Sequence, residues 1–369
     1  MPSVSSMLRP LFLSLCGLAA ATLAPATYAE GMDYFKAQLE PYTHKPTFVA
    51  AGPAFDAAAC AKGKTLFVVP QSSANPFTAT ISKAMHDVGK PLGLDVTVWG
   101  NQGNRNEWAQ GMTTALNQKV SMIDLLAGPD PRALVPQVQA AKAAGIPTVA
   151  SHFNGYEQSA EIAKYAAGDV PIDYLKAGSL LVDWAAWKTN GKLHALLVTA
   201  PGSLSSDSML NGMKAELAKC PGCTAKTLEF PDGWASKITP GVQSALLADP
   251  SINYIIVMYD AMSQFVVPAV TITGSKAKID AFNGTPFAIG LVQQGKVEMD
   301  LGENLDWIGH AIVDADLRRM CGMTPIKNPQ IPLYIFDASN AKDAGTPPKL
   351  SQGYGDAYIA GYQKLWKQP

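Results

Sequence analysis

The chain has 369 residues, enough for two domains that each bury a hydrophobic core. Hydrophobic residues make up 47% of it and charged residues 16%, which fits a compact globular protein and excludes a disordered one. The formal net charge is −1, so the overall charge gives no reason to expect a nucleic-acid partner or binding to an anionic membrane surface.

The first 29 residues have the pattern of a secretory signal peptide. Arg9 precedes a short apolar run at 11–24, and small residues follow at Thr27 and Ala29. A charged start, a short apolar stretch and an Ala-x-Ala-like site are typical of a signal that is removed on export. A membrane anchor is the alternative, but the run is shorter than the roughly 20 residues that a spanning helix needs. We expect export and cleavage after Ala29.

The first half of the remaining chain alternates short apolar strands with amphipathic helices. The helix that follows the first strand carries Ile81, Met85 and Val88 at helical spacing. Strands that alternate with helical segments of about 10–15 residues predict βαβ units and a parallel sheet. The strands are expected at 64–69, 94–99, 121–127 and 148–151.

The same rhythm restarts in the second half. A long helix is expected at 307–320, and a Gly/Pro/Lys-rich tail from about residue 338 ends in a short aromatic helix at 354–366. Two successive doubly wound halves bring their strand C-termini to a crevice, where small molecules bind in such sheets. The strands of this half are expected at 193–199, 226–230, 252–258 and 277–283.

Catalytic and cofactor motifs are missing from the sequence. No Gly-x-Gly-x-x-Gly follows a strand, no Gly-x-Ser-x-Gly elbow occurs, and the five histidines are widely spaced. We therefore expect no enzyme activity, no cofactor and no metal site. His310, Asp314 and Asp316 share one helix, and we interpret them as a solvated helix face.

Four cysteines remain after removal of the signal peptide, which predicts two disulfides in an exported protein. Cys220 and Cys223 form a Cys-x-x-Cys that could be a redox pair, half of a zinc site or a local clamp. The pair follows a helix instead of opening one, and no second Cys-x-x-Cys occurs. These features favour a structural disulfide between Cys220 and Cys223.

Three loop motifs resemble the class I periplasmic solute-binding proteins of ABC importers, the ribose/galactose-binding type. They are ANPF at 74–77, AAGIP at 143–147 and FNGTP at 282–286. The resemblance covers roughly residues 63–336 and implies an α/β fold of two doubly wound parallel-sheet lobes joined by a three-strand hinge. The implied parts are an N-terminal extension (30–62), lobe 1 (63–168 and 304–329), lobe 2 (169–303 and 330–336) and a C-terminal tail (337–369).

The resemblance also implies a set of ligand-binding residues in the crevice between the lobes. Ribose-type proteins have an Asp–Arg pair after the fourth strand, whereas this chain has His152 and Phe153, which removes a bidentate clamp for hydroxyl groups. Glu303 occupies a position that is usually Gln, in a Gly-flanked segment that we interpret as a turn at a hinge crossing. The implied set is Asn75, Phe77, His152, Phe153, Asp207, Trp234, Tyr259, Asn283 and Glu303.

Several of these residues have a structural alternative. Phe77 and Trp234 could belong to the core, although both stand among turn residues. Asp207 could cap the helix that follows it, as could the neighbouring serines. His152 could make a hinge hydrogen bond instead of contacting a ligand.

The remaining cysteines, Cys60 and Cys321, lie just before the first strand and at the end of the long 307–320 helix. In a parallel α/β lobe the helices run antiparallel to the strands, so a helix C-terminus and a strand N-terminus meet at the edge opposite the cleft. We therefore expect a bridge between Cys60 and Cys321, with Cα atoms about 4.4–6.8 Å apart.

The function that the resemblance implies is that of a monomeric periplasmic substrate-binding protein. Such a protein closes about its hinge on a small polar solute, here sugar- or polyol-like, and delivers it to an ABC permease. A chemoreceptor or a sensor kinase is a further expected partner. The alternative is a receptor for an aromatic or amine-bearing solute, because the Asp–Arg pair of the simple sugar binders is absent.

Overall fold

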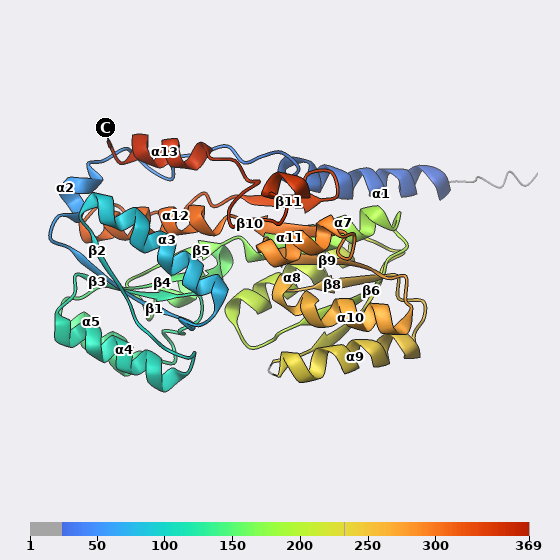
Figure 1. The fold of residues 1–369 in the computed structure, drawn as a ribbon, viewed down its shortest axis with the longest axis horizontal. Coiled ribbons are helices and arrows are strands. Elements are labelled where there is room, and N and C mark those ends of the chain that lie inside the picture. Colours follow the sequence, from blue (N-terminus) through green and yellow to red (C-terminus); the bar gives the residue numbers. More distant parts are fainter. Residues whose placement is uncertain (1–23, 232, 369) are drawn as a thin grey trace, which may run out of the picture.

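Two β-sheets organise the part of the chain that the computed structural model describes, residues 24–231 and 233–368 (Figure 1). Most of the expected signal peptide, residues 1–23, lies outside the described residues. Each sheet is mostly parallel and is flanked by helices, which confirms the predicted fold class.

The first sheet has five strands in the order β2-β1-β3-β4-β5, and all its neighbouring strands are parallel. Every residue of β3 and β4 is buried, including the polar side chains of Asp124 in β3 and of Ser151 and His152 in β4. The sheet continues past the expected lobe boundary at residue 168, because β5 also belongs to it. The strands are β1 (Thr65–Pro70), β2 (Asp95–Val98), β3 (Met122–Leu126), β4 (Thr148–Gly155) and β5 (Gly168–Ile172).

The second sheet has six strands in the order β11-β10-β9-β8-β6-β7, of which only the β10–β11 pair is antiparallel. The edge strand β7 is largely exposed, whereas β8 is fully buried. The strands are β6 (His194–Thr199), β7 (Thr224–Glu229), β8 (Tyr254–Val257), β9 (Lys278–Asn283), β10 (Met299–Glu303) and β11 (Leu333–Asp337).

Several of the helices begin at a polar side chain that caps them. Asn75 caps α3 by accepting the backbone N–H of Phe77 at 3.0 Å, and Asn304 caps α12 in the same way. The helices are α1 (Ala24–Leu39), α2 (Ala57–Ala61), α3 (Pro76–Leu92), α4 (Arg105–Gln118), α5 (Val135–Ala143), α6 (Ser159–Ile162), α7 (Tyr174–Lys188), α8 (Leu204–Leu217), α9 (Trp234–Ala248), α10 (Ser263–Thr273), α11 (Pro286–Gln293), α12 (Leu305–Met320) and α13 (Ala357–Leu365).

The chain passes three times between the two sheets and their helices, which we call the first and second lobes. It leaves the first lobe after β5, returns after β10, and leaves again between α12 and β11. Helix α12 belongs to the first lobe, because Trp307 and Ile312 share a core with Leu66 and Ile81. These three crossings are the connectivity that the resemblance to type I binding proteins implies.

Two terminal segments also connect the lobes. Helix α1 packs on α7 of the second lobe, and the chain then runs to α2 in the first. The tail runs the opposite way, from a 3-10 turn, η4 (Ala341–Ala344), packed in the second lobe to α13 on the first. The backbone N–H of Phe55 donates to the carbonyl of Leu365 at 2.9 Å, so the two segments lie side by side where they reach the first lobe (Figure 1).

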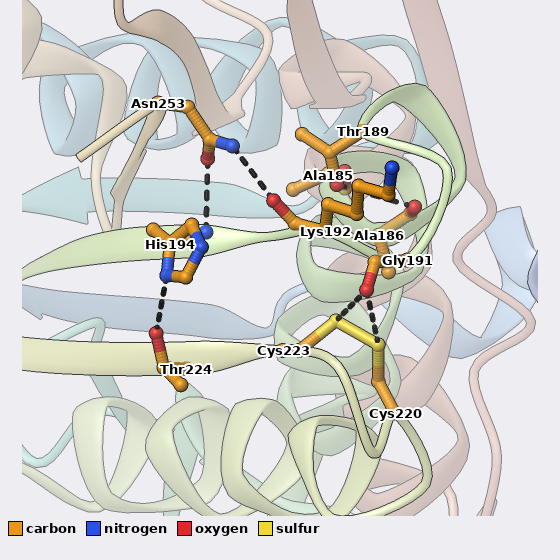
Figure 2. Close-up of a disulfide and its surroundings, with 10 residues drawn as sticks. All are labelled: Ala185, Ala186, Thr189, Gly191, Lys192, His194, Cys220, Cys223, Thr224 and Asn253. Carbon is orange, nitrogen blue, oxygen red and sulfur yellow. Dashed lines mark hydrogen bonds between the residues drawn. A yellow bond between two sulfur atoms is a disulfide. The ribbon is translucent and has the colours of Figure 1, made fainter. Parts of the chain in front are cut away.

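Both expected cysteine pairs are bridged in the structure. The Cα atoms of Cys60 and Cys321 lie 5.9 Å apart, where α2 meets the end of α12. The Cα atoms of Cys220 and Cys223 lie 5.2 Å apart, just before β7. Figure 2 shows the carbonyl oxygen of Gly191 facing this second bridge, 3.8 and 3.9 Å from the two sulfurs.

The prediction of a solvated helix face around His310 is wrong. Asp314 and Asp316 are each only 1% exposed. Asp314 accepts from the Arg318 guanidinium at 2.9 Å and from the Trp366 indole at 2.7 Å, and the His310 ring stacks on Trp366. Asp314 is covered by Trp366 at the end of the C-terminal helix α13, whereas Asp316 lies against Asp124 of β3.

Candidate functional site

Three of the predicted site residues meet where strands from both lobes end. His152 comes from the C-terminal part of β4, Asn283 is the last residue of β9, and Glu303 is the last residue of β10. The carboxylate oxygen Oε1 of Glu303 accepts from His152 Nε2 at 3.0 Å and from Asn283 Nδ2 at 3.4 Å. We call these three side chains the edge cluster; it joins the first lobe to the second.

His152 is held from three sides. Its backbone has a φ of 51°, in the left-handed region, at an irregularity in the pairing of β4 with β5. The hydroxyl of Tyr174 lies 2.6 Å from His152 Nδ1, and the ring of Phe77 packs edge-on at 5.2 Å. A residue with this uncommon backbone persists only where its surroundings hold it, as these contacts do.

Glu303 lies in a strand, so the prediction that it stands in a Gly-flanked turn is wrong. It pairs with Leu333 of β11, is fully buried, and immediately precedes the crossing to α12. Its second oxygen, Oε2, has no hydrogen-bond partner among the described residues. The hinge crossing that motivated the prediction is present, but it begins one residue later.

Asn283 provides a second buried acceptor without a partner. Its side chain donates to Glu303, but its Oδ1 has no partner within the described part of the chain. Its φ of 143° also lies outside the usual range of a residue with a side chain. A buried polar atom without a partner costs about 1–3 kcal/mol, so the edge cluster has two acceptors suited to hydroxyl or ammonium donors.

Asn75 and Phe77 lie at the first turn of α3 but differ in what they contact. The exposed Asn75 uses its side-chain oxygen to cap the helix, and its amide lies 3.5 Å from the Gln71 side chain. Phe77 is half-buried and contacts both the first-lobe core and His152. The structure therefore brings Phe77, but not Asn75, into contact with the edge cluster.

Trp234 and Tyr259 form a second group in the second lobe. Their rings stack with centroids 6.3 Å apart, and the Tyr259 hydroxyl lies 3.0 and 2.9 Å from the hydroxyls of Ser205 and Ser206. Trp234 is half-buried and donates its indole N–H to the carbonyl of Phe230. Trp234 is therefore neither fully in the core nor fully exposed, whereas the sequence left open whether it lies in the core or contacts a ligand.

Asp207 and Phe153 lie outside both groups. Asp207 is exposed in the first turn of α8, whose N-cap is Ser203. Phe153 is buried in a small apolar cluster that includes Ile162 and Leu204, and thereby packs β4 against the start of α8. Phe153 therefore contributes to packing between the lobes.

Sequence comparison identifies the family. A family model described as a periplasmic binding protein domain matches residues 66–320, which is more than half of the chain. The chain belongs to the periplasmic binding protein family. This confirms the resemblance seen in the loop motifs, and it agrees with the expectation of a binding protein in the periplasm and not an enzyme.

Solved structures similar to this binding protein are themselves solute-binding proteins. An ABC transporter periplasmic solute-binding protein from Actinobacillus succinogenes 130z, with bound D-allose, has a TM-score of 0.68 at 18% identity, over 76% of this chain and 99% of that one. The Caulobacter myo-inositol binding protein has a TM-score of 0.66 at 18% identity, over 77% and 96%. A carbohydrate transporter from Acidothermus cellulolyticus 11B, in complex with myo-inositol, has a TM-score of 0.63 at 23% identity, over 77% of this chain and 96% of that one. A comparison with curated protein sequences found no match.

Two tyrosines of the binding protein that sequence reasoning missed, together with Asp260, complete the surroundings of the edge cluster. Tyr174, the first residue of α7, bonds His152, and Tyr354 of the C-terminal tail donates to the carbonyl of Glu303 at 3.2 Å. Asp260 accepts the backbone N–H of Thr285 at 2.8 Å, and burial raises its pKa to about 6. Neither tyrosine has a local sequence signal, because each acts on a partner distant in the chain.

Metal and membrane features are absent from the described residues. No three His, Cys, Asp or Glu side chains of residues 24–231 and 233–368 are grouped so that they could hold a metal ion. No helix in those two ranges has the length and apolar character needed to cross a membrane.

Proposed function

We propose that this binding protein captures a neutral sugar or polyol between its lobes and delivers it to an ABC importer. One observation carries the proposal: Glu303 Oε2 and Asn283 Oδ1 are buried acceptors at the junction of the lobes, and neither has a partner among residues 24–231 and 233–368. Hydroxyl groups of a polyol are donors that match them. The D-allose and myo-inositol bound to similar structures support this ligand class.

The side chains around the two acceptors favour a neutral solute over an acid. No Arg or Lys hydrogen-bonds to His152, Asn283 or Glu303 in the described structure, so nothing there would neutralise a carboxylate or phosphate. The Phe77 ring offers an apolar surface of the kind that covers the C–H face of a sugar ring.

Closure of the lobes follows from where the site lies. The edge cluster unites β4 of the first lobe with β9 and β10 of the second, beside the crossing from β10 to α12. A solute that contacts both lobes is bound better in the closed form, and this difference in affinity is what drives closure.

Thermal unfolding in the presence of single solutes tests the proposal. The panel contains the ligands of similar structures: D-allose, D-tagatose, myo-inositol and allitol. At a concentration of about 100 times Kd, a ligand raises the free energy of unfolding by about 2.7 kcal/mol. A clear rise in melting temperature with at least one neutral polyol is the expected result, and a flat response to all sugars and polyols would contradict the proposal.

A second candidate is a receptor for an aromatic or amine-bearing solute, because the free oxygen of the buried Glu303 carboxylate would also accept from an ammonium group. D-Glucosamine and D-glucose differ by an ammonium in place of a hydroxyl, and tyramine adds an aromatic amine. Binding of D-glucosamine or tyramine, with no binding of their neutral counterparts, would favour this candidate.

The remaining sequence-based expectations belong to this proposal. We propose export with cleavage after Ala29, a monomer, and a chemoreceptor or sensor kinase as a further partner. The lobe boundaries are proposed as expected, except that the one at residue 168 moves to the end of β5 at Ile172. Intact-mass measurement of the periplasmic protein checks the cleavage site. Light scattering checks the monomer.

A further inference from the structure

The C-terminal tail places one buried side chain directly behind the edge cluster. Tyr354 is 1% exposed and lies between η4, which packs in the second lobe, and α13, which packs on the first. The family match ends at residue 320, so the tail lies outside the matched region. No residue of the tail was a candidate for the site from sequence.

The Tyr354 hydroxyl contacts the backbone that carries both unpartnered acceptors. It donates to the carbonyl of Glu303 at 3.2 Å and to that of Gly284, the residue after Asn283, at 3.3 Å. Burial raises the pKa of Tyr354 well above its ordinary value, so the phenol stays protonated and remains a donor. One hydroxyl therefore ties the ends of β9 and β10 together.

The backbone around Tyr354 is shaped to admit it. A Cβ atom at Gly284 or at Gly302 would overlap the Tyr354 hydroxyl. The ring also packs edge-on against Phe336 of β11, with centroids 4.8 Å apart. Glycine at these two positions, one before Glu303 and one after Asn283, leaves the space that the tail fills.

We infer that Tyr354 is a positioning residue of the solute site: through its hydroxyl, the tail holds the ends of β9 and β10 so that Asn283 and Glu303 present their free oxygens to the solute. This inference rests on the proposed function for the identity of the solute, whereas the contacts of the Tyr354 hydroxyl are seen in the structure. Asn283 needs such support, because its φ of 143° is unfavourable for a residue with a side chain.

The test compares Tyr354→Phe with a matched control, Tyr334→Phe. Tyr334 is equally buried in the same aromatic cluster, 5.8 Å from Tyr354 between ring centroids, but its hydroxyl bonds Asn340 instead of the site. Each variant keeps its ring and loses one hydroxyl, so similar losses of stability are expected. Solute affinity is measured by calorimetry, and amide hydrogen exchange is measured in the ligand-free protein over 282–286 and 299–304.

The expected result is a three- to tenfold weaker Kd in Tyr354→Phe only, the range that corresponds to about one hydrogen bond. Faster exchange in both segments is expected in the same variant, and wild-type values in Tyr334→Phe. Equal Kd values in the two variants, or unchanged exchange in Tyr354→Phe, would overturn the inference. If no solute of the panel binds, the proposed function fails, and the exchange data alone decide whether Tyr354 holds the two strand ends.

Discussion

Replacement of Glu303 by Gln tests both the site and the ligand class. The substitution keeps the shape of the side chain and keeps an oxygen that accepts from His152 and Asn283. It converts the unpartnered acceptor Oε2 into an N–H donor and removes a buried negative charge. The bonds to His152 and Asn283 keep an acceptor, so the largest change falls on the position that we assign to the solute.

The size of the effect depends on what the solute presents. A hydrogen bond to a charged group contributes about 1.5–3 kcal/mol and one to a neutral group about 0.5–1.5 kcal/mol. A solute hydroxyl that can turn to accept from the Gln amide therefore loses about 1–1.5 kcal/mol of binding free energy, which weakens Kd about five- to tenfold. A solute ammonium cannot accept, and breaking its buried ion pair costs about 3–5 kcal/mol, which is more than a hundredfold.

Isothermal titration calorimetry at pH 7 on the wild type and Glu303→Gln distinguishes these cases. Glu298→Gln is the matched control, because Glu298 just precedes β10 and bonds Tyr254 at the other end of the strand. An affinity that stays unchanged in Glu303→Gln, for any solute that the wild type binds, would refute the assignment of Glu303 to the site.

Three further outcomes are expected. Phe77→Ala should weaken solute binding at least tenfold, as measured by calorimetry. Because Phe77 is half-buried, the free energy of unfolding in urea should fall by less than the roughly 3–5 kcal/mol lost with a fully buried Phe. A large loss of stability without loss of affinity would show that Phe77 belongs to the core. Replacing both Cys60 and Cys321 by Ala should lower the free energy of unfolding in urea by about 2–5 kcal/mol, because the bridge spans 261 residues. The Kd for the solute should stay unchanged. Equal stability of variant and wild type would show that the bridge is absent from the mature protein. Burial raises the pKa of Asp124 from its ordinary value near 4 to about 7, so its contribution to stability is fully present below about pH 4 and is lost as the pH rises from about 4 to 7. Asp124→Asn should therefore flatten the fall in stability between pH 4 and 7 by up to about 1.4 kcal/mol per pH unit, and an unchanged slope would mean that Asp124 titrates normally.

Most strands lie in segments that the sequence predicted, whereas β5 and β10 do not. β3, β6 and β8 each lie within a predicted segment, and β1 extends one residue past its own. β5 contains Gly168 and Pro171, and β10 buries Asp300 and Glu303, so neither matches an apolar or alternating pattern. Their strand conformation is imposed by neighbouring strands, which local sequence does not describe.

Coverage by a distant segment explains the wrong interpretation of the α12 face. Asp314 and Asp316 look solvated when α12 is considered alone. Helix α13, from the end of the chain, supplies Trp366, which bonds Asp314 and stacks on His310. A contact between residues so far apart in sequence depends on the tertiary fold, so the periodicity of α12 could not reveal it.

The edge cluster shows the same division between local and non-local information. The family resemblance placed His152 after the fourth strand, Asn283 in a loop motif and Glu303 at a hinge crossing. Parallel strands bring such positions to one edge of the sheet, so the meeting of the three residues was expected from sequence and topology. The hydrogen bonds of the three residues could not be predicted in this way, because they involve Tyr174 from a hinge crossing and Tyr354 from the tail. With these partners in place, His152 is satisfied, and Glu303 and Asn283 each retain one free acceptor. Tyr174 and Tyr354, which lie in no loop motif, therefore help to determine which hydrogen-bond donors a solute needs in order to bind.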